Sequence, residues 1–321
     1  MVCVPLFVML TGYLCNKKEL TKRYFIGILP VLVTYGLCAV VTLLWRSKVW
    51  GEEISLLWGI SEILRIDGGA IWYGWYIEMY IGLYLLIPFL NLIYNGLVTQ
   101  QKKRILLSVM LLLTMLPISM NIYDFSTSGF WQNPNISQTY HVLLPKWWTG
   151  LWPLTYYFIG AYIREYRIRL PKFLGLAVLV GCLLGFTGYS IYRSQGTSLF
   201  RPNLDNWGGF QNTIDSIVLF LMMLSLDMTR IPESIRKIIS HVAKLSLGIY
   251  LCSYISDVEV YRRFNALELT LSDQLLYYPL VVLTSFLFAG VLSQFVSWVQ
   301  WLLARGTEIL VRHLLGKAAK R

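Results

Sequence analysis

The sequence is poor in charged residues. Only 14% of its 321 residues are Asp, Glu, Lys or Arg, whereas 56% are apolar and the mean hydropathy is +0.56. Soluble domains carry about 25% charged residues, so this composition excludes an ordinary soluble protein. We therefore predict an all-α integral membrane protein, because a helix satisfies its own backbone hydrogen bonds in lipid.

Cysteine and histidine are also scarce, and we find no repeat, no low-complexity tract and no soluble domain. The three histidines and five cysteines form neither a CxxC pair nor a Cys–His cluster. This pattern indicates packing residues rather than disulfides or metal ligands. We therefore expect no metal cofactor, and a single polytopic domain over residues 1–321.

The basic residues alternate between the gaps that separate the apolar segments. Of 28 Lys and Arg, 19 lie in residues 16–23, 101–104, 164–172 and 228–238 and in the tail after Ala304, and 8 lie in the other gaps. Because Lys and Arg are retained in cytoplasmic loops, the rich gaps and the C-terminus are predicted to be cytoplasmic. Topology and anionic lipids thus account for the net charge of +11, and we expect no nucleic-acid partner.

Nine apolar segments are predicted to form a compact helical bundle. They cover residues 2–15, 24–45, 72–95, 105–120, 147–163, 173–192, 213–227, 239–256 and 275–304. Nine spans with a cytoplasmic C-terminus place the N-terminus outside, which is awkward without a signal sequence. We therefore expect ten spans in the complete protein, with the first one upstream of this chain.

Three stretches resemble the acyltransferase-3 family of membrane acyltransferases. VPLFVMLTGYL (Val4–Leu14), followed by a basic loop, is similar to the family's second span. WYIEMYIGLYLLIP (Trp75–Pro88) and SLGIYLCS (Ser246–Ser253) are similar to two later spans. The order and spacing of the three stretches match the family as well.

The resemblance implies about ten spans and an O-acyltransferase. Such proteins move an acyl group, often acetyl, from cytosolic acyl-CoA to a sugar of a surface glycan or its lipid-linked precursor. Acyl-CoA would be a co-substrate, and the protein would lie in a bacterial plasma membrane beside its lipids and its glycan acceptor. The family's catalytic His lies in the first span, which we expect to be missing here, so an inactive chain is an alternative.

Glu78 is interpreted as the one carboxylate deep within a span, where a charge is costly and faces a partner or a cavity. It is a candidate for acceptor binding or proton transfer, and a hydrogen-bonded structural Glu is the alternative. Tyr76 lies two positions away, on nearly the opposite helix face. Tyr76 is a candidate substrate-binding residue, and core packing is its alternative.

Ser246, Tyr250 and Ser253 share one helix face and are further candidate catalytic residues. They could bond a sugar hydroxyl or a thioester, although serines also bond between helices in bundles. Candidate acyl-CoA ligands are the predicted cytoplasmic cations Lys17, Lys18, Lys22, Arg23 and Lys244, which can offset phosphate charge. Topology and snorkelling to headgroups would also explain them.

Trp207 stands beside amide side chains in a predicted outer loop, and it is a candidate for binding a sugar ring. Interface anchoring would explain a Trp there equally well. Two rival functions stay open. One is a glycan-precursor transporter or flippase coupled to protons through Glu78, and the other is an inactive scaffold in glycan synthesis.

Overall fold

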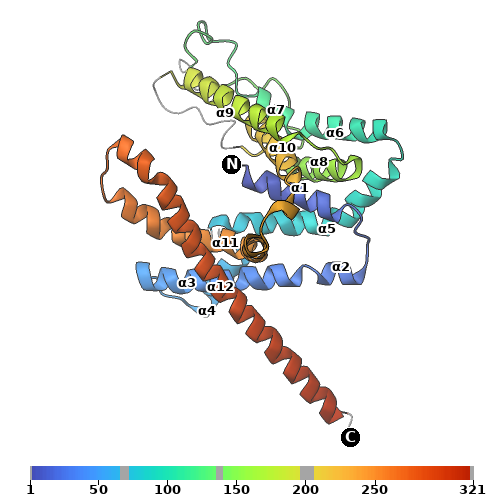
Figure 1. The fold of residues 1–321 in the computed structure, drawn as a ribbon, viewed down its shortest axis with the longest axis vertical. Coiled ribbons are helices and arrows are strands. Elements are labelled where there is room, and N and C mark those ends of the chain that lie inside the picture. The colour runs from blue at the N-terminus through green and yellow to red at the C-terminus, as the bar shows by residue number, and fades with distance from the viewer. Residues whose placement is uncertain (1, 66–71, 135–139, 196–205, 319–321) are drawn as a thin grey trace. The chain divides into compact units, whose positions relative to one another are not determined.

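The computed structural model describes residues 2–65, 72–134, 140–195 and 206–318, and within these ranges every regular element is a helix (Figure 1). The absence of strands from the described residues confirms the prediction of an all-α protein. Each of the nine predicted apolar segments contains a main helix. These helices are α1 (Cys3–Cys15), α3 (Leu29–Trp50), α5 (Trp75–Gly96), α6 (Gln100–Thr114), α8 (Trp152–Tyr166), α9 (Lys172–Ser194), α10 (Phe210–Leu224), α11 (Glu233–Asn265) and α12 (Leu271–Ala318).

Five of the described helical stretches are long and apolar enough to cross a membrane. They are Lys22–Trp50, Trp72–Gly96, Lys172–Ser194, Glu233–Asn265 and Leu271–Gly306. The helices α1 and α10 are apolar but shorter than 18 residues. A membrane protein built of helices is therefore confirmed, whereas the count of nine full spans stays a prediction.

Short helices occupy places where the sequence predicts loops or continuous spans. They are α2 (Lys22–Ile26), α4 (Leu56–Leu64) and α7 (Leu116–Met120). The hydroxyl of Ser55 accepts the Trp58 N–H and caps the start of α4. Arg65 ends this helix in the left-handed conformation. This local capping explains a helix within residues 46–71, which were predicted to form a loop.

The helix α11 runs nine residues past its predicted end at residue 256. The prediction was wrong because Asp257 and Glu259 suggested a loop. In the structure both carboxylates accept hydrogen bonds. Asp257 accepts from Tyr73 and Ser285, and Glu259 accepts from Trp45 and Arg262. Glu78 is therefore not the one carboxylate within a spanning helix.

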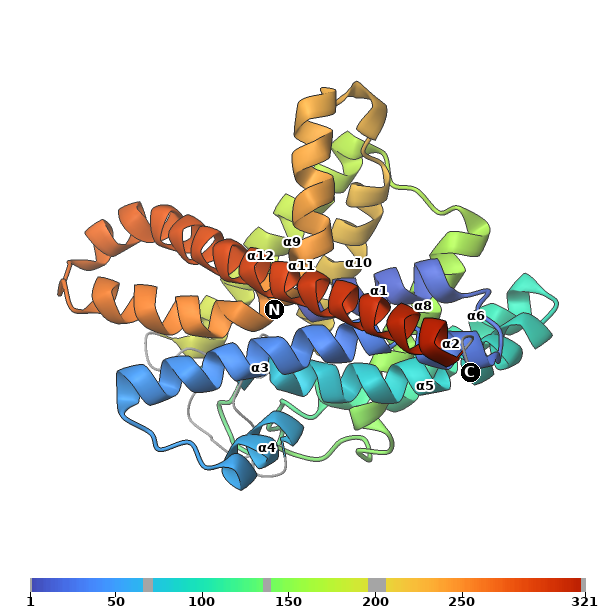
Figure 2. The same ribbon diagram turned by 90° about the horizontal axis from the view of Figure 1, so that it is seen from below.

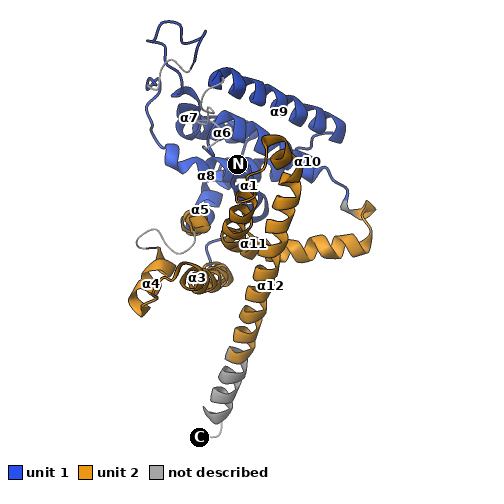
Figure 3. Cartoon of the chain, turned by 90° about the vertical axis from the view of Figure 1, so that its left-hand side faces the viewer, with its two compact units in different colours: residues 1–21, 83–228 blue, residues 22–82, 229–321 orange. Residues whose placement is uncertain are grey.

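The chain divides into two compact units, shown in two colours in Figure 3. Unit 1 contains residues 1–21 and 83–228, and unit 2 contains residues 22–82 and 229–321. Each unit combines two separated stretches of sequence. The boundary between the units therefore does not divide the chain into an N-terminal and a C-terminal half. A single domain over residues 1–321 stays a prediction.

The centre of unit 1 is the close packing of α1 against α8. A Cβ added to Gly12 would lie 2.0 Å from the Tyr157 carbonyl oxygen, and one added to Gly160 would lie 2.0 Å from the Met9 carbonyl oxygen. The side chain of Asn91 joins this contact. Its Nδ2 donates to the Cys15 carbonyl at 2.8 Å, and its Oδ1 accepts the Tyr157 hydroxyl at 2.6 Å. Small residues thus allow two backbones to meet, as in many membrane bundles.

One arginine of unit 1 is fully buried among aromatic rings. Arg193, near the end of α9, donates to the Tyr189 hydroxyl at 2.8 Å and to the Ile122 carbonyl at 2.9 Å. Its guanidinium lies 5.1 to 5.8 Å from the ring centres of Tyr123, Phe130 and Tyr189. This aromatic cage fixes the segment after α7 to α9 through cation–π contacts and hydrogen bonds.

Unit 2 is built on a hairpin of α11 and α12, and α12 also packs on α3 (Figure 2). The face of α12 that meets its neighbours carries a buried stripe at helical spacing: Val281, Ser285, Ala289, Ser293 and Val296. The hydroxyl of Ser293 donates to the Leu245 carbonyl at 3.0 Å, and the hydroxyls of Ser285 and Ser256 lie 3.0 Å apart. Small and hydroxylated residues therefore join these helices.

Candidate functional site

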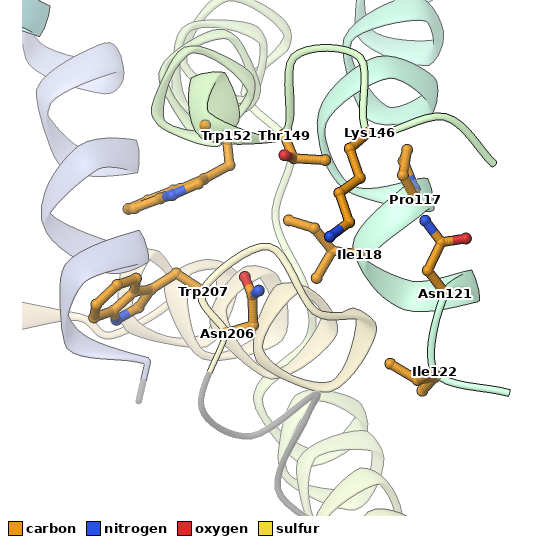
Figure 4. Close-up of a pocket in the computed structure, with 10 residues that line it drawn as sticks. Pro117, Ile118, Asn121, Ile122, Lys146, Thr149, Trp152, Asn206 and Trp207 are labelled. Carbon is orange, nitrogen blue, oxygen red and sulfur yellow. The ribbon is translucent and has the colours of Figure 1, made fainter. Parts of the chain in front are cut away.

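A cavity of about 470 Å³ opens in unit 1 between segments that the charge pattern assigns to the outer side. Its lining comes from α7 and the two residues after it, from the start of α8 and the segment before it, and from the segment before α10. The lining residues are Pro117, Ile118, Asn121, Ile122, Lys146, Thr149, Gly150, Trp152, Asn206 and Trp207 (Figure 4). Trp207, a candidate substrate ligand from the sequence, is therefore a pocket residue.

Hydrogen bonds hold the wall of this pocket in place. The side chain of Asn121 donates to the Leu144 carbonyl at 2.8 Å and accepts the Leu144 N–H at 2.9 Å. Both ends of this amide are therefore used to join two segments of the wall. On the opposite side, the hydroxyl of Tyr156 donates to the Trp207 carbonyl at 2.6 Å.

The turn that carries Trp207 depends on Asn206 and Gly208. The Asn206 Oδ1 accepts the Gly208 N–H at 3.1 Å, so its Nδ2 is the end of the amide left for other partners. A Cβ on Gly208 would lie 2.6 Å from Ile118 Cδ1. Glycine at this position lets the turn approach α7 closely, and this close approach shapes the floor of the pocket.

The pocket offers one aromatic wall and several polar groups. The rings of Trp152 and Trp207 stack with centres 5.7 Å apart and planes 28° apart, and Trp152 is the more buried of the two. Figure 4 shows the amino group of Lys146 directed into the space near Ile118 and Asn206. An indole beside hydroxyl, amide and ammonium donors is suited to a polar ring such as a sugar.

Sequence reasoning missed Lys146 and Trp152 as pocket residues, whereas Asn206 is one of the amides that stand beside Trp207 in the sequence. A signal for Lys146 was present, because it is the single Lys or Arg between residues 121 and 146. The positive-inside rule keeps Lys and Arg out of outer loops, so it does not explain a lysine in this predicted outer loop. No comparable signal marked Trp152, since a Trp at a span end is typical of an interface anchor.

In unit 2 the carboxylate of Glu78 is paired with Arg65, which ends α4. The Arg65 side chain is 11% exposed and that of Glu78 is 54% exposed. The ion pair with Arg65 offsets the cost of a charged side chain on α5. It agrees with the alternative interpretation of Glu78 as a hydrogen-bonded structural residue. Its roles in proton transfer and acceptor binding stay predictions.

Tyr76 and Tyr250, both site candidates, meet edge to face with ring centres 5.5 Å apart. Tyr76 is 7% exposed and also stacks on Tyr80 at 5.9 Å. The ring of Tyr73 lies 5.6 Å from Tyr250, and its hydroxyl donates to Asp257 at 3.0 Å. The structure therefore brings Tyr76 and Tyr250 together in an aromatic cluster beside a carboxylate that the sequence assigned to a loop.

The two serine candidates on α11 differ in their surroundings. The hydroxyl of Ser253 donates to the Tyr250 carbonyl of its own helix at 2.8 Å, which is an ordinary bond for a helical serine. Ser246 is half-buried nearer the start of the helix. Neither the stacking of Tyr250 nor the bond of Ser253 tests their predicted catalytic roles.

Lys244 lines a second cavity, of about 250 Å³, within unit 2. The cavity lies between the start of α3, the α11 segment around Gly248 and the α12 segment from Ser293 to Gln300. The Thr34 hydroxyl donates to Gln300 Oε1 at 3.0 Å on its wall. The predicted cytoplasmic cation Lys244 thus stands beside a space with polar walls.

The other predicted acyl-CoA ligands are exposed. Lys17 and Lys18 follow α1 in unit 1, whereas Lys22 and Arg23 begin α2 in unit 2. Exposure is compatible with binding phosphate and with a purely topological role. Their predicted contact with acyl-CoA stays a prediction.

Comparison with known proteins identifies the family. A family model described as an acyltransferase domain, that of acyltransferase family 3, matches residues 1–294. No curated protein matches, and no solved structure matches. The match extends across both units and contains all three stretches that carry the resemblance. The chain therefore belongs to the acyltransferase-3 family of membrane acyltransferases.

Proposed function

We propose that this chain is an O-acyltransferase of a bacterial plasma membrane. It moves an acyl group, in the first instance acetyl, from cytosolic acyl-CoA to a hydroxyl of a surface polysaccharide or its lipid-linked precursor. Family membership supports acyl transfer in a membrane. The donor, the acceptor and the orientation with a cytoplasmic C-terminus are part of the proposal.

The observation that carries the acceptor assignment is the pocket of unit 1. Its volume of about 470 Å³ is in the range of small-ligand sites. Its stacked indoles, the Thr149 hydroxyl and the Asn206 amide match the apolar face and the hydroxyls of a sugar ring. The charge pattern assigns its segments to the outer side, from which a surface glycan would approach.

The reaction is the attack of a sugar hydroxyl on a thioester, and it requires the acyl end of the donor to reach the acceptor hydroxyl from the cytoplasmic side. The hydroxyl oxygen forms a bond to the acyl carbonyl carbon, the carbon–sulfur bond breaks, and coenzyme A leaves as a thiolate that takes up a proton. A base receives the hydroxyl proton, and hydrogen-bond donors stabilise the oxyanion. The cations Lys17, Lys18, Lys22, Arg23 and Lys244 are proposed to offset the phosphate charges of the donor on the cytoplasmic side.

The test is acyl transfer in membranes that contain the full chain. Membranes are incubated with acetyl-CoA labelled in the acetyl group, and label is measured in glycan and lipid-linked sugar fractions. Trp207→Ala should raise the apparent KM for the acceptor about tenfold, because ring contacts contribute up to about 1.5 kcal/mol. Trp147→Ala is the matched control, since Trp147 is 45% exposed and does not line the pocket.

Each outcome separates the proposal from its rivals. Label in the glycan that depends on the chain and on Trp207 supports the O-acyltransferase. Glycan export that requires the chain but no acyl-CoA would instead indicate a transporter. Normal glycan assembly, with no acyl transfer in any preparation, would indicate a scaffold and would overturn the proposal.

A further inference from the structure

The acceptor pocket of unit 1 contains a cation but no carboxylate among its ten lining residues. The cation is Lys146, whose amino group points into the space (Figure 4). Across the described ranges 2–65, 72–134, 140–195 and 206–318, no ion pair joins Lys146 to an acidic side chain. The pocket therefore presents positive charge to whatever enters it.

The surroundings make this cation stand out. The gaps on the predicted outer side hold ten of the 17 acidic residues of the chain and few of the basic ones. Lys146 follows closely after Leu144, whose backbone is fixed by two hydrogen bonds to Asn121. The start of the lysine side chain is therefore held at the pocket wall.

The neighbouring groups indicate what kind of anion fits. Trp152 and Trp207 contribute apolar surface to the lining, and Asn206 Nδ2 and the Thr149 hydroxyl can bond to ring substituents. A bare inorganic anion would leave the aromatic wall unused, and a neutral sugar would leave the ammonium without a counter-charge. A sugar that carries a negative charge uses both features, because ammonium groups bind carboxylate and phosphate through charge-assisted hydrogen bonds.

We propose that this pocket selects an anionic saccharide, with the negative charge at Lys146 and the saccharide extending toward the Trp152 and Trp207 side of the pocket. The charge can be the carboxylate of a uronic acid within a glycan or the phosphate of a sugar phosphate in a lipid-linked precursor. The inference deepens the proposed function, since it rests on the pocket being the acceptor site. It defines the acceptor class by charge.

The experiment measures saccharide binding to the full chain in neutral-lipid nanodiscs by titration calorimetry. One arm compares a tetrasaccharide of glucose and glucuronic acid with a neutral glucose tetrasaccharide. A second arm compares glucose 1-phosphate with glucose. In at least one arm the charged ligand should bind about tenfold more tightly at low salt, and the advantage should shrink at high salt because screening weakens the pair.

Substitutions locate the preference. Lys146→Gln should abolish the advantage of the charged ligand, whereas Lys146→Arg should retain it. Lys48→Gln is the matched control, because Lys48 is an exposed lysine in another gap assigned to the outer side and does not line this pocket. Both Lys146 variants should keep the melting temperature of the unsubstituted chain, which shows that the pocket remains folded.

The results distinguish the inference from the proposed function. Equal affinity for charged and neutral ligands in both arms, or a preference that survives in Lys146→Gln, overturns the anionic assignment even if acyl transfer is observed. A preference that depends on Lys146 without acyl transfer supports the pocket assignment and counts against the O-acyltransferase. Whichever arm carries the preference identifies the source of the charge.

Discussion

The contact between α1 and α8 makes a quantitative prediction for Gly12→Ala. The added Cβ would lie 2.0 Å from the Tyr157 carbonyl oxygen, whereas real Cβ contacts essentially never fall below 3.0 Å. The nearest atoms belong to the backbone, so no side chain can rotate away. The helices must therefore separate by about 1 Å at this point, and the contact between Gly160 and Met9 on the same interface is loosened with it.

The expected loss of stability is about 3 kcal/mol, at the upper end of the cost of overpacking a core. The assay is thermal or detergent-induced unfolding of the purified full chain, followed by a probe of unit 1. The matched control is Gly181→Ala on α9, where a Cβ would meet nothing within 4 Å. That control should be neutral or slightly stabilising, because alanine is the better helix former by about 1 kcal/mol.

The comparison has a clear refuting result. If Gly12→Ala unfolds at the same temperature as Gly181→Ala, the backbones of α1 and α8 do not approach as closely as described. A double variant, Gly12→Ala with Gly160→Ala, adds a second check. Its loss should be smaller than the sum of the single losses, because the first substitution has already separated the helices.

Two further predictions concern charged pairs. In unit 1 partial burial alone would raise the pKa of Glu165, but the hydrogen bond from Lys103 at 2.6 Å and the positive charge of that lysine lower it below the ordinary 4.5. The pair of Glu165 and Lys103 should therefore stabilise the fold above about pH 4.5, and this contribution should be lost as the pH falls through the lowered pKa. Glu165→Gln should flatten this part of the pH profile of the melting temperature. An unchanged profile would contradict the pairing. In unit 2 Glu78→Gln and Arg65→Gln should destabilise the chain by similar amounts, and the double variant should lose less than their sum. Strict additivity in a double-mutant cycle would show that Glu78 acts independently of Arg65.

The sequence predicts the fold class well because hydropathy and charge act locally. Each apolar segment contains a helix, since its side chains and backbone require one in lipid whatever the neighbours are. The end of α11 was predicted wrongly because charge was taken as a sign of a loop. Asp257 remains helical because Tyr73 and Ser285 satisfy its carboxylate, and such partners are distant in sequence.

The candidate site was predictable only in part, for a related reason. Trp207 stood out as an aromatic residue beside amides, and the structure places it in a pocket. Its partner Trp152 and the wall residue Asn121 belong to other segments, so their roles depend on tertiary contacts that no local pattern contains. The pairing of Glu78 with Arg65 was hidden too, because Arg65 lies in a segment that was predicted to be a loop.

The buried Arg193 has a consequence for how the protein is made. An arginine in an apolar helix opposes insertion by up to about 3 kcal/mol at the helix centre and by less near an end. Tyr123 and Phe130, which enclose its guanidinium, precede it in the chain by more than 60 residues. During synthesis from the N-terminus, the ribosome therefore delivers these rings before the arginine that they enclose. Since the partners are already outside the ribosome, α9 can bury its charge as soon as it enters the membrane.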